Sequence, residues 1–170
     1  MNLDLLAPKI AKHDKQAFQQ LYEQLRGLVF TVCLGVVKNK GVAEEIMQET
    51  FVSVWTSSVQ FRGKGYKTWI LTIARNKALN VLKRNSKERV TDFMEDEYAL
   101  GSYETDAETG IVLKLALETL DEQDRQIVLM RVGGMQAKEI AKTLGLPRGT
   151  VSWRYTEALK ILKTKLEGAL

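Results

Sequence analysis

The chain has 170 residues, a formal net charge of +4, one histidine and one cysteine. This count excludes a dense His/Cys metal site, and a lone cysteine excludes an intrachain disulfide. Apolar residues at 45% and charged residues at 27% are typical of soluble globular proteins, so the chain should bury a core as one ordinary domain or two small ones.

The amino-terminal residues have no basic segment followed by a long apolar one, and no stretch approaches the roughly 20 apolar residues that a bilayer span needs. We therefore expect a cytoplasmic protein. Cys33 lies inside an apolar run and is expected to be a reduced thiol in the core.

The first half of the chain predicts helices. Apolar residues recur every three or four positions over 15–37, which indicates one or two amphipathic helices, and again over 42–55. A loop with two glycines over 61–68 then leads into a third helical pattern over 69–82.

Composition changes after residue 90. The segment 91–110 contains several acidic residues and no Lys or Arg, which indicates an acidic linker. Helical periodicity resumes over 111–120, 122–132, 136–144 and 148–166, and no strand pattern appears. We predict an all-α protein in which two small helical domains, 1–90 and 111–170, are joined by an acidic linker.

The second domain carries the spacing of a helix-turn-helix. Gly145 ends a short helix, Pro147 opens the next, the small Ala141 lets the two helices cross closely, and Val151 packs the second helix onto the first. The amino-terminal end of the second helix enters the major groove in such motifs. The candidate duplex-binding residues are Arg148, Gly149, Thr150, Ser152, Trp153 and Arg154.

In this set, Arg148 suits a guanine edge or a phosphate, and Arg154 suits backbone neutralisation. The alternative is that both arginines are ordinary solvated charges and that Trp153 only covers a neighbouring surface.

The first domain holds a basic segment over 62–89, in which Glu88 is the only acidic residue. Its loop mixes cationic residues with Phe61, Tyr66 and Trp69, as expected where unstacked bases lie on aromatic rings beside a positive track. Single-stranded DNA is therefore a candidate ligand. The alternatives are that the aromatic residues belong to the core and that the charges form a solvated face.

Two stretches resemble one family. AEEIMQETFVSVW, followed by FRGKGYKTWILTIARNKALNVLKR, is similar to region 2 of sigma factors of the extracytoplasmic-function (ECF) type, in the sigma-70 family of bacterial RNA polymerase. LETLDEQDRQIVLMRVGGMQAKEIAKTLGLPRGTVSWRYTEALKILK resembles region 4, including the EIA and GTV residues. The two matches stand in the family's order, with the linker at 91–110 where larger sigma factors have region 3.

The resemblance implies a promoter-specific initiation factor that binds core RNA polymerase. Region 2 would bind the polymerase clamp through the acidic helix 42–55, at Glu45, Gln48 and Glu49. Region 4 would bind the minus-35 duplex through the helix that starts at Arg148, and the acidic linker would lie in the RNA exit path or act only as a tether.

Region 2 would also melt and read the minus-10 element, with a flipped base captured by the loop 61–68. The implied minus-10 residues are Arg62, Lys64, Tyr66, Lys67, Arg75, Asn76, Asn80, Lys83 and Arg84. The chain departs from the family at Asn80, where aspartate is usual, and at Glu157 and Leu159, where basic residues are common. Base preference and backbone contacts are therefore not transferred from the family in either domain.

The resemblance further implies an anti-sigma partner, which no residue identifies, as none identifies the promoter sequence or the inducing signal. An enzyme is the main alternative of another class, and the sequence offers it no phosphate-cradling loop and no dense metal site. A self-sufficient helix-turn-helix regulator is the second alternative, and the region 2 resemblance argues against it. We expect no catalytic residue, no metal and no cofactor.

Overall fold

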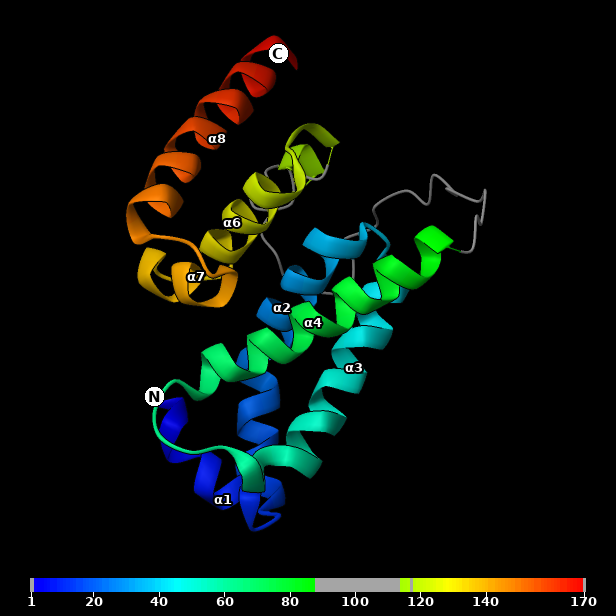
Figure 1. The fold of residues 1–170 in the computed structure, drawn as a ribbon, viewed down its shortest axis with the longest axis vertical. Coiled ribbons are helices and arrows are strands. Elements are labelled where there is room, and N and C mark those ends of the chain that lie inside the picture. Colours follow the sequence, from blue (N-terminus) through cyan, green and yellow to red (C-terminus); the bar gives the residue numbers. More distant parts are fainter. Residues whose placement is uncertain (1, 88–113, 117, 170) are drawn as a thin grey trace.

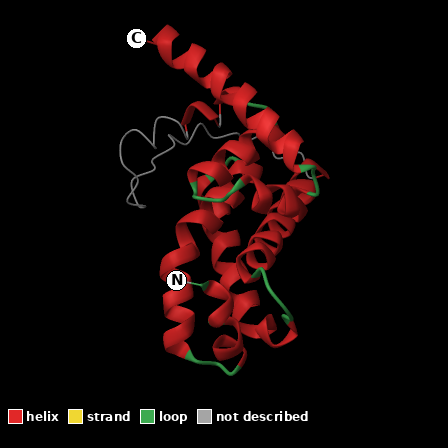
Figure 2. Cartoon of the chain, turned by 90° about the vertical axis from the view of Figure 1, so that its left-hand side faces the viewer, coloured by secondary structure: helices red, strands yellow, loops and turns green. Residues whose placement is uncertain are grey.

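The computed structural model describes residues 2–87, 114–116 and 118–169, and it is helical throughout these ranges, with short turns between the helices (Figure 1). Figure 2 shows no strand in the same part of the chain, as the periodicity predicted. The predicted acidic linker 91–110 lies outside the described residues. The elements are η1 Leu3–Leu5, α1 Ala7–Ala11, α2 Lys15–Val37, α3 Lys40–Ser57, η2 Ser58–Gln60, α4 Tyr66–Lys87, α6 Glu122–Val132, α7 Ala137–Leu144 and α8 Arg148–Ala169.

Local capping fixes where the long helices of the first half begin. The Asp14 carboxylate accepts from the backbone amides of Gln16 and Ala17 at the start of α2, and the Asn39 side chain accepts from Val42 N at 2.9 Å at the start of α3. Lys38 adopts a left-handed conformation, with φ at 56°, between these two helices. Such caps satisfy amides that the helix itself leaves unpaired.

The core of the first half forms where α2, α3 and α4 cross one another. Leu21, Ile46 and Ile70 are among the fully enclosed side chains. Cys33 is a buried free thiol, as expected, and burial raises its pKa to about 12.

Two short elements precede α2 that the periodicity did not indicate. They are η1 and α1, and Ile10 of α1 is fully buried against the first half. Helices of three to five residues contain too few turns to produce a periodic signal.

The second half is a helix-turn-helix with α6 packed beside it. Gly145 ends α7 with φ at 67°, the left-handed conformation that glycine adopts without strain, and Val151 N donates to the carbonyl oxygen of Pro147 at the start of α8. Val151 of α8 is buried, as predicted, and Ala158 and Leu162 further along the helix are buried with it.

The two halves pack against each other through α2 and α6, and through α4 and α7. A Cβ atom placed on Gly35 of α2 would lie 3.1 Å from Leu129 Cδ1 of α6, so the absence of a side chain allows this close approach. Arg125 Nε donates to the carbonyl oxygen of Gly35 at 2.6 Å, and Arg75 Nε donates to Gln126 Oε1 at 3.0 Å. The sequence predicted the two halves but not this contact.

Candidate nucleic-acid and protein interfaces

The loop 61–65 connects η2 to α4 and is held at both ends. Gly63 and Gly65 have φ values of 94° and 89°, which residues with a Cβ atom adopt only under strain. The Arg62 guanidinium donates to the carbonyl oxygens of Val59 and Phe61, while Lys64 is exposed. The loop ends at residue 65 and not at residue 68 as expected, because positions 66–68 form the first turn of α4.

Tyr66, a predicted minus-10 residue, is fully buried. Its hydroxyl shares a hydrogen bond of 2.5 Å with Ser58 Oγ, and its ring stacks at 5.6 Å from that of Trp69. Burial raises the pKa of the Tyr66 phenol, and the bond with Ser58 opposes this rise. The ring is therefore part of the core in this conformation, and it is not available to stack on a base.

Phe61 and Trp69 are half-buried beside Tyr66. Ring centroids lie 4.9 Å apart for Phe61 and Tyr66, and 5.4 Å apart for Phe61 and Trp69. These three rings form one aromatic cluster at the junction of the loop and α4. Phe61 and Trp69 keep partial exposure, whereas the Tyr66 ring is fully enclosed.

The outer face of α4 brings four of the predicted minus-10 residues together. Asn76, Asn80, Lys83 and Arg84 are all exposed. Their spacing of three and four residues sets them along one side of the helix. This α4 face is polar and cationic, as contact with a phosphate backbone requires.

Two further predicted minus-10 residues are engaged by the second half of the molecule. Lys67 Nζ lies 3.7 Å from Glu139 Oε1 of α7, and both side chains are about one-third exposed or less. Arg75 is half-buried and bonded to Gln126 of α6. The packing of the two halves against each other therefore covers part of the basic segment, which the sequence alone does not reveal.

The predicted minus-35 residues gather at the first turns of α8. Arg148, Gly149 and Ser152 are exposed, and the Trp153 side chain is 64% exposed, which is unusual for so large an apolar group. Thr150 is half-buried. A helix end that presents an arginine, small residues and an exposed indole has the shape of a recognition helix.

Arg154 differs from the rest of this set because it is paired within the protein. Its Nη1 lies 2.8 Å from Asp124 Oδ1 and 3.8 Å from Asp121 Oδ2, at the start of α6. Asp121 also caps α6 by accepting from Asp124 N at 2.8 Å. Arg154 thus links α8 to α6, and its charge is partly compensated within the protein.

The predicted polymerase-binding residues Glu45, Gln48 and Glu49 are all exposed on α3. Beside Gln48 runs an apolar groove of about 370 Å³ between α2 and α3, whose lining includes Phe18, Tyr22, Phe51, Val52 and Trp55. Val52 is 63% exposed on it. The sequence indicated the acidic residues but not this α2–α3 groove, because the groove forms only where the two helices pack together.

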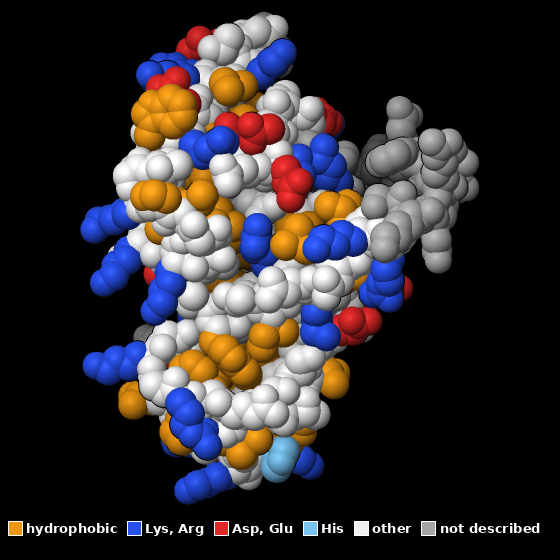
Figure 3. All heavy atoms as spheres, viewed as in Figure 1, with side chains coloured by type: hydrophobic (Ala, Val, Ile, Leu, Met, Phe, Trp, Pro, Cys, Tyr) orange, Lys and Arg blue, Asp and Glu red, His pale blue; other side chains and the backbone are white. Residues whose placement is uncertain are grey.

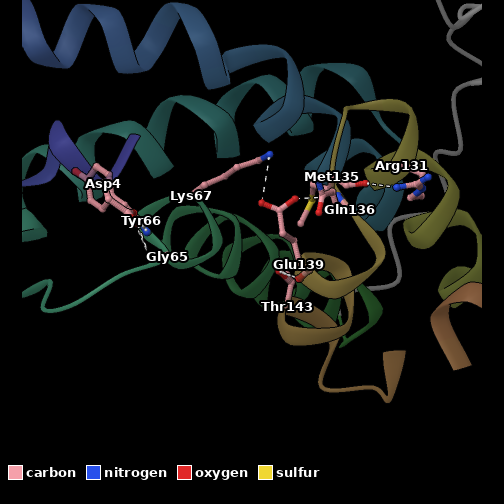
Figure 4. A network of polar contacts seen from close by, with 9 residues as sticks. All are labelled: Asp4, Gly65, Tyr66, Lys67, Arg131, Met135, Gln136, Glu139 and Thr143. Atoms are coloured by element: carbon pink, nitrogen blue, oxygen red, sulfur yellow. Dashed lines mark hydrogen bonds and ion pairs between the residues drawn. The ribbon is translucent and has the colours of Figure 1, made fainter. Parts of the chain in front are cut away.

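Asp4 also belongs to the candidate minus-10 site, although the sequence did not indicate it. Its Oδ1 accepts from Tyr66 N at 2.8 Å and from Gly65 N at 3.1 Å, at the junction of the loop and α4 (Figure 4). Asp4 precedes Gly65 by 61 residues, so no local spacing could have indicated the contact.

Lys and Arg side chains project along the left-hand edge of the face seen in Figure 3, where Figure 1 has the start of α4 and, above it, α7 with the start of α8. Within the described residues, no group of three or more His, Cys, Asp or Glu is placed to hold a metal ion. No helix in the same ranges is long and apolar enough to cross a membrane.

Comparison with known proteins gives two family matches. Residues 21–88 match sigma-70 region 2, and residues 111–162 match sigma-70 region 4. An ECF RNA polymerase sigma factor, SigK of Mycobacterium tuberculosis strain H37Rv, is 28% identical over 98% of this chain and 94% of its own length. A SigK of Mycobacterium sp. strain KMS is 27% identical over 99% of this chain and 87% of its own.

Two solved structures share the fold. The sigma factor RpoE in complex with the anti-sigma factor NepR, from Bartonella quintana, superposes with a TM-score of 0.70 at 22% identity, over 88% of this chain and 96% of that one. CnrH in complex with the cytosolic domain of CnrY superposes with a TM-score of 0.67 at 22% identity, over 96% of both chains. With a region 2 match, a region 4 match and full-length relatives in agreement, the chain belongs to the sigma-70 family, as a sigma factor of the ECF type.

Proposed function

We propose that this ECF sigma factor directs promoter-specific transcription initiation by RNA polymerase, with its first half reading the minus-10 element and its second half binding the minus-35 duplex. The observation that carries the proposal is the joint presence of regions 2 and 4 in one chain. A self-sufficient regulator needs only the helix-turn-helix, whereas a sigma factor needs both.

In the first half, the α4 face would follow the single-stranded backbone while the loop 61–65 holds a base taken out of the stack. Taking a base out of a duplex costs a few kcal/mol, so a positive track and a receptive surface are needed together. Asn76, Asn80, Lys83 and Arg84 would supply the track, with Arg62 and Lys64 at its loop end. Lys67 and Arg75 would join after release from α7 and α6.

In the second half, the exposed start of α8 would enter the major groove of the minus-35 duplex. Arg148 is the residue we assign to a guanine edge or a phosphate, and Trp153 to an apolar contact beside it. Arg154 acts mainly as a structural link to α6, because its guanidinium is already paired with Asp124.

Core polymerase would be bound through α3. The α2–α3 groove offers an apolar floor with Gln48 at its edge and the exposed Glu45 and Glu49 on the same helix. An apolar contact surrounded by polar groups is the usual composition of a protein interface. A basic partner surface would complement the two carboxylates.

We further propose that the protein has no catalytic activity of its own, that it works in the cytoplasm beside the polymerase, and that an anti-sigma protein restrains it. The last point is supported by the two solved relatives, which are both described as complexes, one of them with a named anti-sigma factor.

The test is run-off transcription with bacterial core polymerase on promoter fragments from the source genome, with and without the protein. Initiation from a defined subset, only when the protein is present, is the expected result, and it also yields the promoter sequence. No stimulation, together with tight duplex binding by the protein alone, would overturn the proposal in favour of an independent regulator.

A further inference from the structure

The start of α4 has no capping side chain of its own. Gly65 occupies the cap position, since it directly precedes α4 and its carbonyl oxygen accepts the first helical hydrogen bond, from Trp69 N at 3.0 Å. A glycine has no side chain that could accept from the unpaired amides at the start of the helix. Its φ of 89° also favours glycine at this position, so a serine or aspartate cap would be strained there.

The Asp4 carboxylate caps this end of α4 instead, although Asp4 lies near the start of the chain. Its Oδ1 accepts from Tyr66 N at 2.8 Å and from Gly65 N at 3.1 Å, and its Oδ2 lies 3.3 Å from Gly65 N (Figure 4). A carboxylate at this end of a helix also interacts favourably with the helix dipole. Asp4 is held in turn by η1, where its own amide donates to Asn2 Oδ1 at 3.0 Å.

We propose that Asp4 is a positioning residue for minus-10 reading, and that it sets the conformation of the loop 61–65 by capping α4 across the chain. The proposal rests on the function proposed above. It extends the reading site to a segment that precedes the region 2 match, which starts at residue 21. Without the carboxylate, Gly65 and Tyr66 would lose the acceptor that fixes their amides, and two glycines with positive φ would leave the loop many alternative conformations.

The experiment compares Asp4→Ala with Asp4→Asn and with a matched control, Asp14→Ala. Asp14 caps α2 with two comparable bonds of 3.0 Å and does not touch the loop. The three variants and the wild type are assembled with core polymerase. The probe is a fluorescent single-stranded oligonucleotide that carries the non-template minus-10 sequence mapped by run-off transcription, and a second oligonucleotide with the captured base replaced.

Loss of a cap is expected to weaken oligonucleotide binding by about three- to tenfold in Asp4→Ala, and to narrow the preference for the mapped base over the replaced one. Asp4→Asn keeps an acceptor oxygen and should restore both properties. Asp14→Ala should retain them, although it loses a cap of the same kind. An equal effect of Asp4→Ala and Asp14→Ala would reduce Asp4 to a general stabiliser and overturn the proposal.

A second measurement does not depend on transcription. Amide hydrogen exchange at Gly65 and Tyr66 should be faster in Asp4→Ala than in wild type or in Asp14→Ala. Unchanged exchange would remove the physical basis of the proposal even if the protein is a sigma factor. Failure of the wild-type protein to stimulate transcription, with faster exchange in Asp4→Ala, would instead reject the proposed function and retain the cap.

Discussion

Arg125 of α6 donates from Nε to the backbone carbonyl oxygen of Gly35 in α2, at 2.6 Å and across a separation of 90 residues. The guanidinium is buried. Desolvation lowers the pKa of Lys38, and the nearby positive charge of Arg125 lowers it further. A buried cation stays inside a protein only when its donors are satisfied. The two halves of this sigma factor are therefore joined by a specific polar contact as well as by apolar packing.

Gly35→Leu should separate the two halves. The added side chain would meet Leu129, which is fully buried, and Gln126 beside it, and such overpacking costs about 1–3 kcal/mol. The expected result is a larger radius of gyration in small-angle X-ray scattering. Because opening would release Lys67 and Arg75, we also expect tighter binding of minus-10 single strands.

The control for this substitution is Gly27→Leu in the same helix. A Cβ atom at Gly27 would meet nothing within 4 Å, so the same change is accommodated there. Its radius of gyration should match that of the wild type. If Gly35→Leu also leaves the radius unchanged, the packing of α2 on α6 does not hold the halves together in solution.

Tyr66→Phe tests whether the Tyr66 hydroxyl serves the core or the DNA. The substitution removes the bond with Ser58 Oγ, whose hydroxyl still donates to the carbonyl oxygen of Val54 at 2.6 Å. Loss of one buried hydrogen bond should lower the free energy of unfolding by about 1 kcal/mol. Urea denaturation measures this change.

Binding of single-stranded minus-10 DNA by the polymerase complex should stay unchanged in Tyr66→Phe, because the ring is enclosed and its backbone amide still reaches Asp4. A clear loss of affinity without a loss of stability would mean that the phenol contacts DNA after all.

The sequence was sufficient for the helices of both halves because their apolar positions repeat over several turns. Spacing alone indicated that Val151 packs inside the helix-turn-helix and that Gly145 lies at its turn. It could not reveal that Asp4 caps α4 or that Arg154 is paired with Asp124, since both contacts join residues far apart in the chain. Whether a charged residue contacts the protein itself or stays free for a partner is therefore decided by tertiary packing, which the sequence pattern does not show.

Arg148→Ala and Arg154→Ala remove the same charge from one helix and should differ in their effect. Arg148 is exposed, so its loss should weaken binding to the mapped minus-35 duplex by about 1–3 kcal/mol if it addresses a base, and should flatten the salt dependence if it contacts a phosphate. Arg154→Ala should lower stability and change affinity less. Fluorescence anisotropy at several salt concentrations distinguishes these outcomes, and equal losses from both substitutions would contradict the distinction.

Val52→Glu should impair assembly with core polymerase. Val52 is 63% exposed on the α2–α3 groove, beside Gln48, and a carboxylate there would have to be desolvated on binding a partner.

Val59→Glu is the matched control, because Val59 is 56% exposed on η2 and does not line the groove. Competition for limiting polymerase against the unmodified protein measures the effect. We expect Val52→Glu to lose the competition by at least about tenfold, a difference of about 1.4 kcal/mol, while Val59→Glu competes normally. Equal competition by the two variants would place the polymerase contact elsewhere on the surface, since both substitutions add the same charge to a similarly exposed valine.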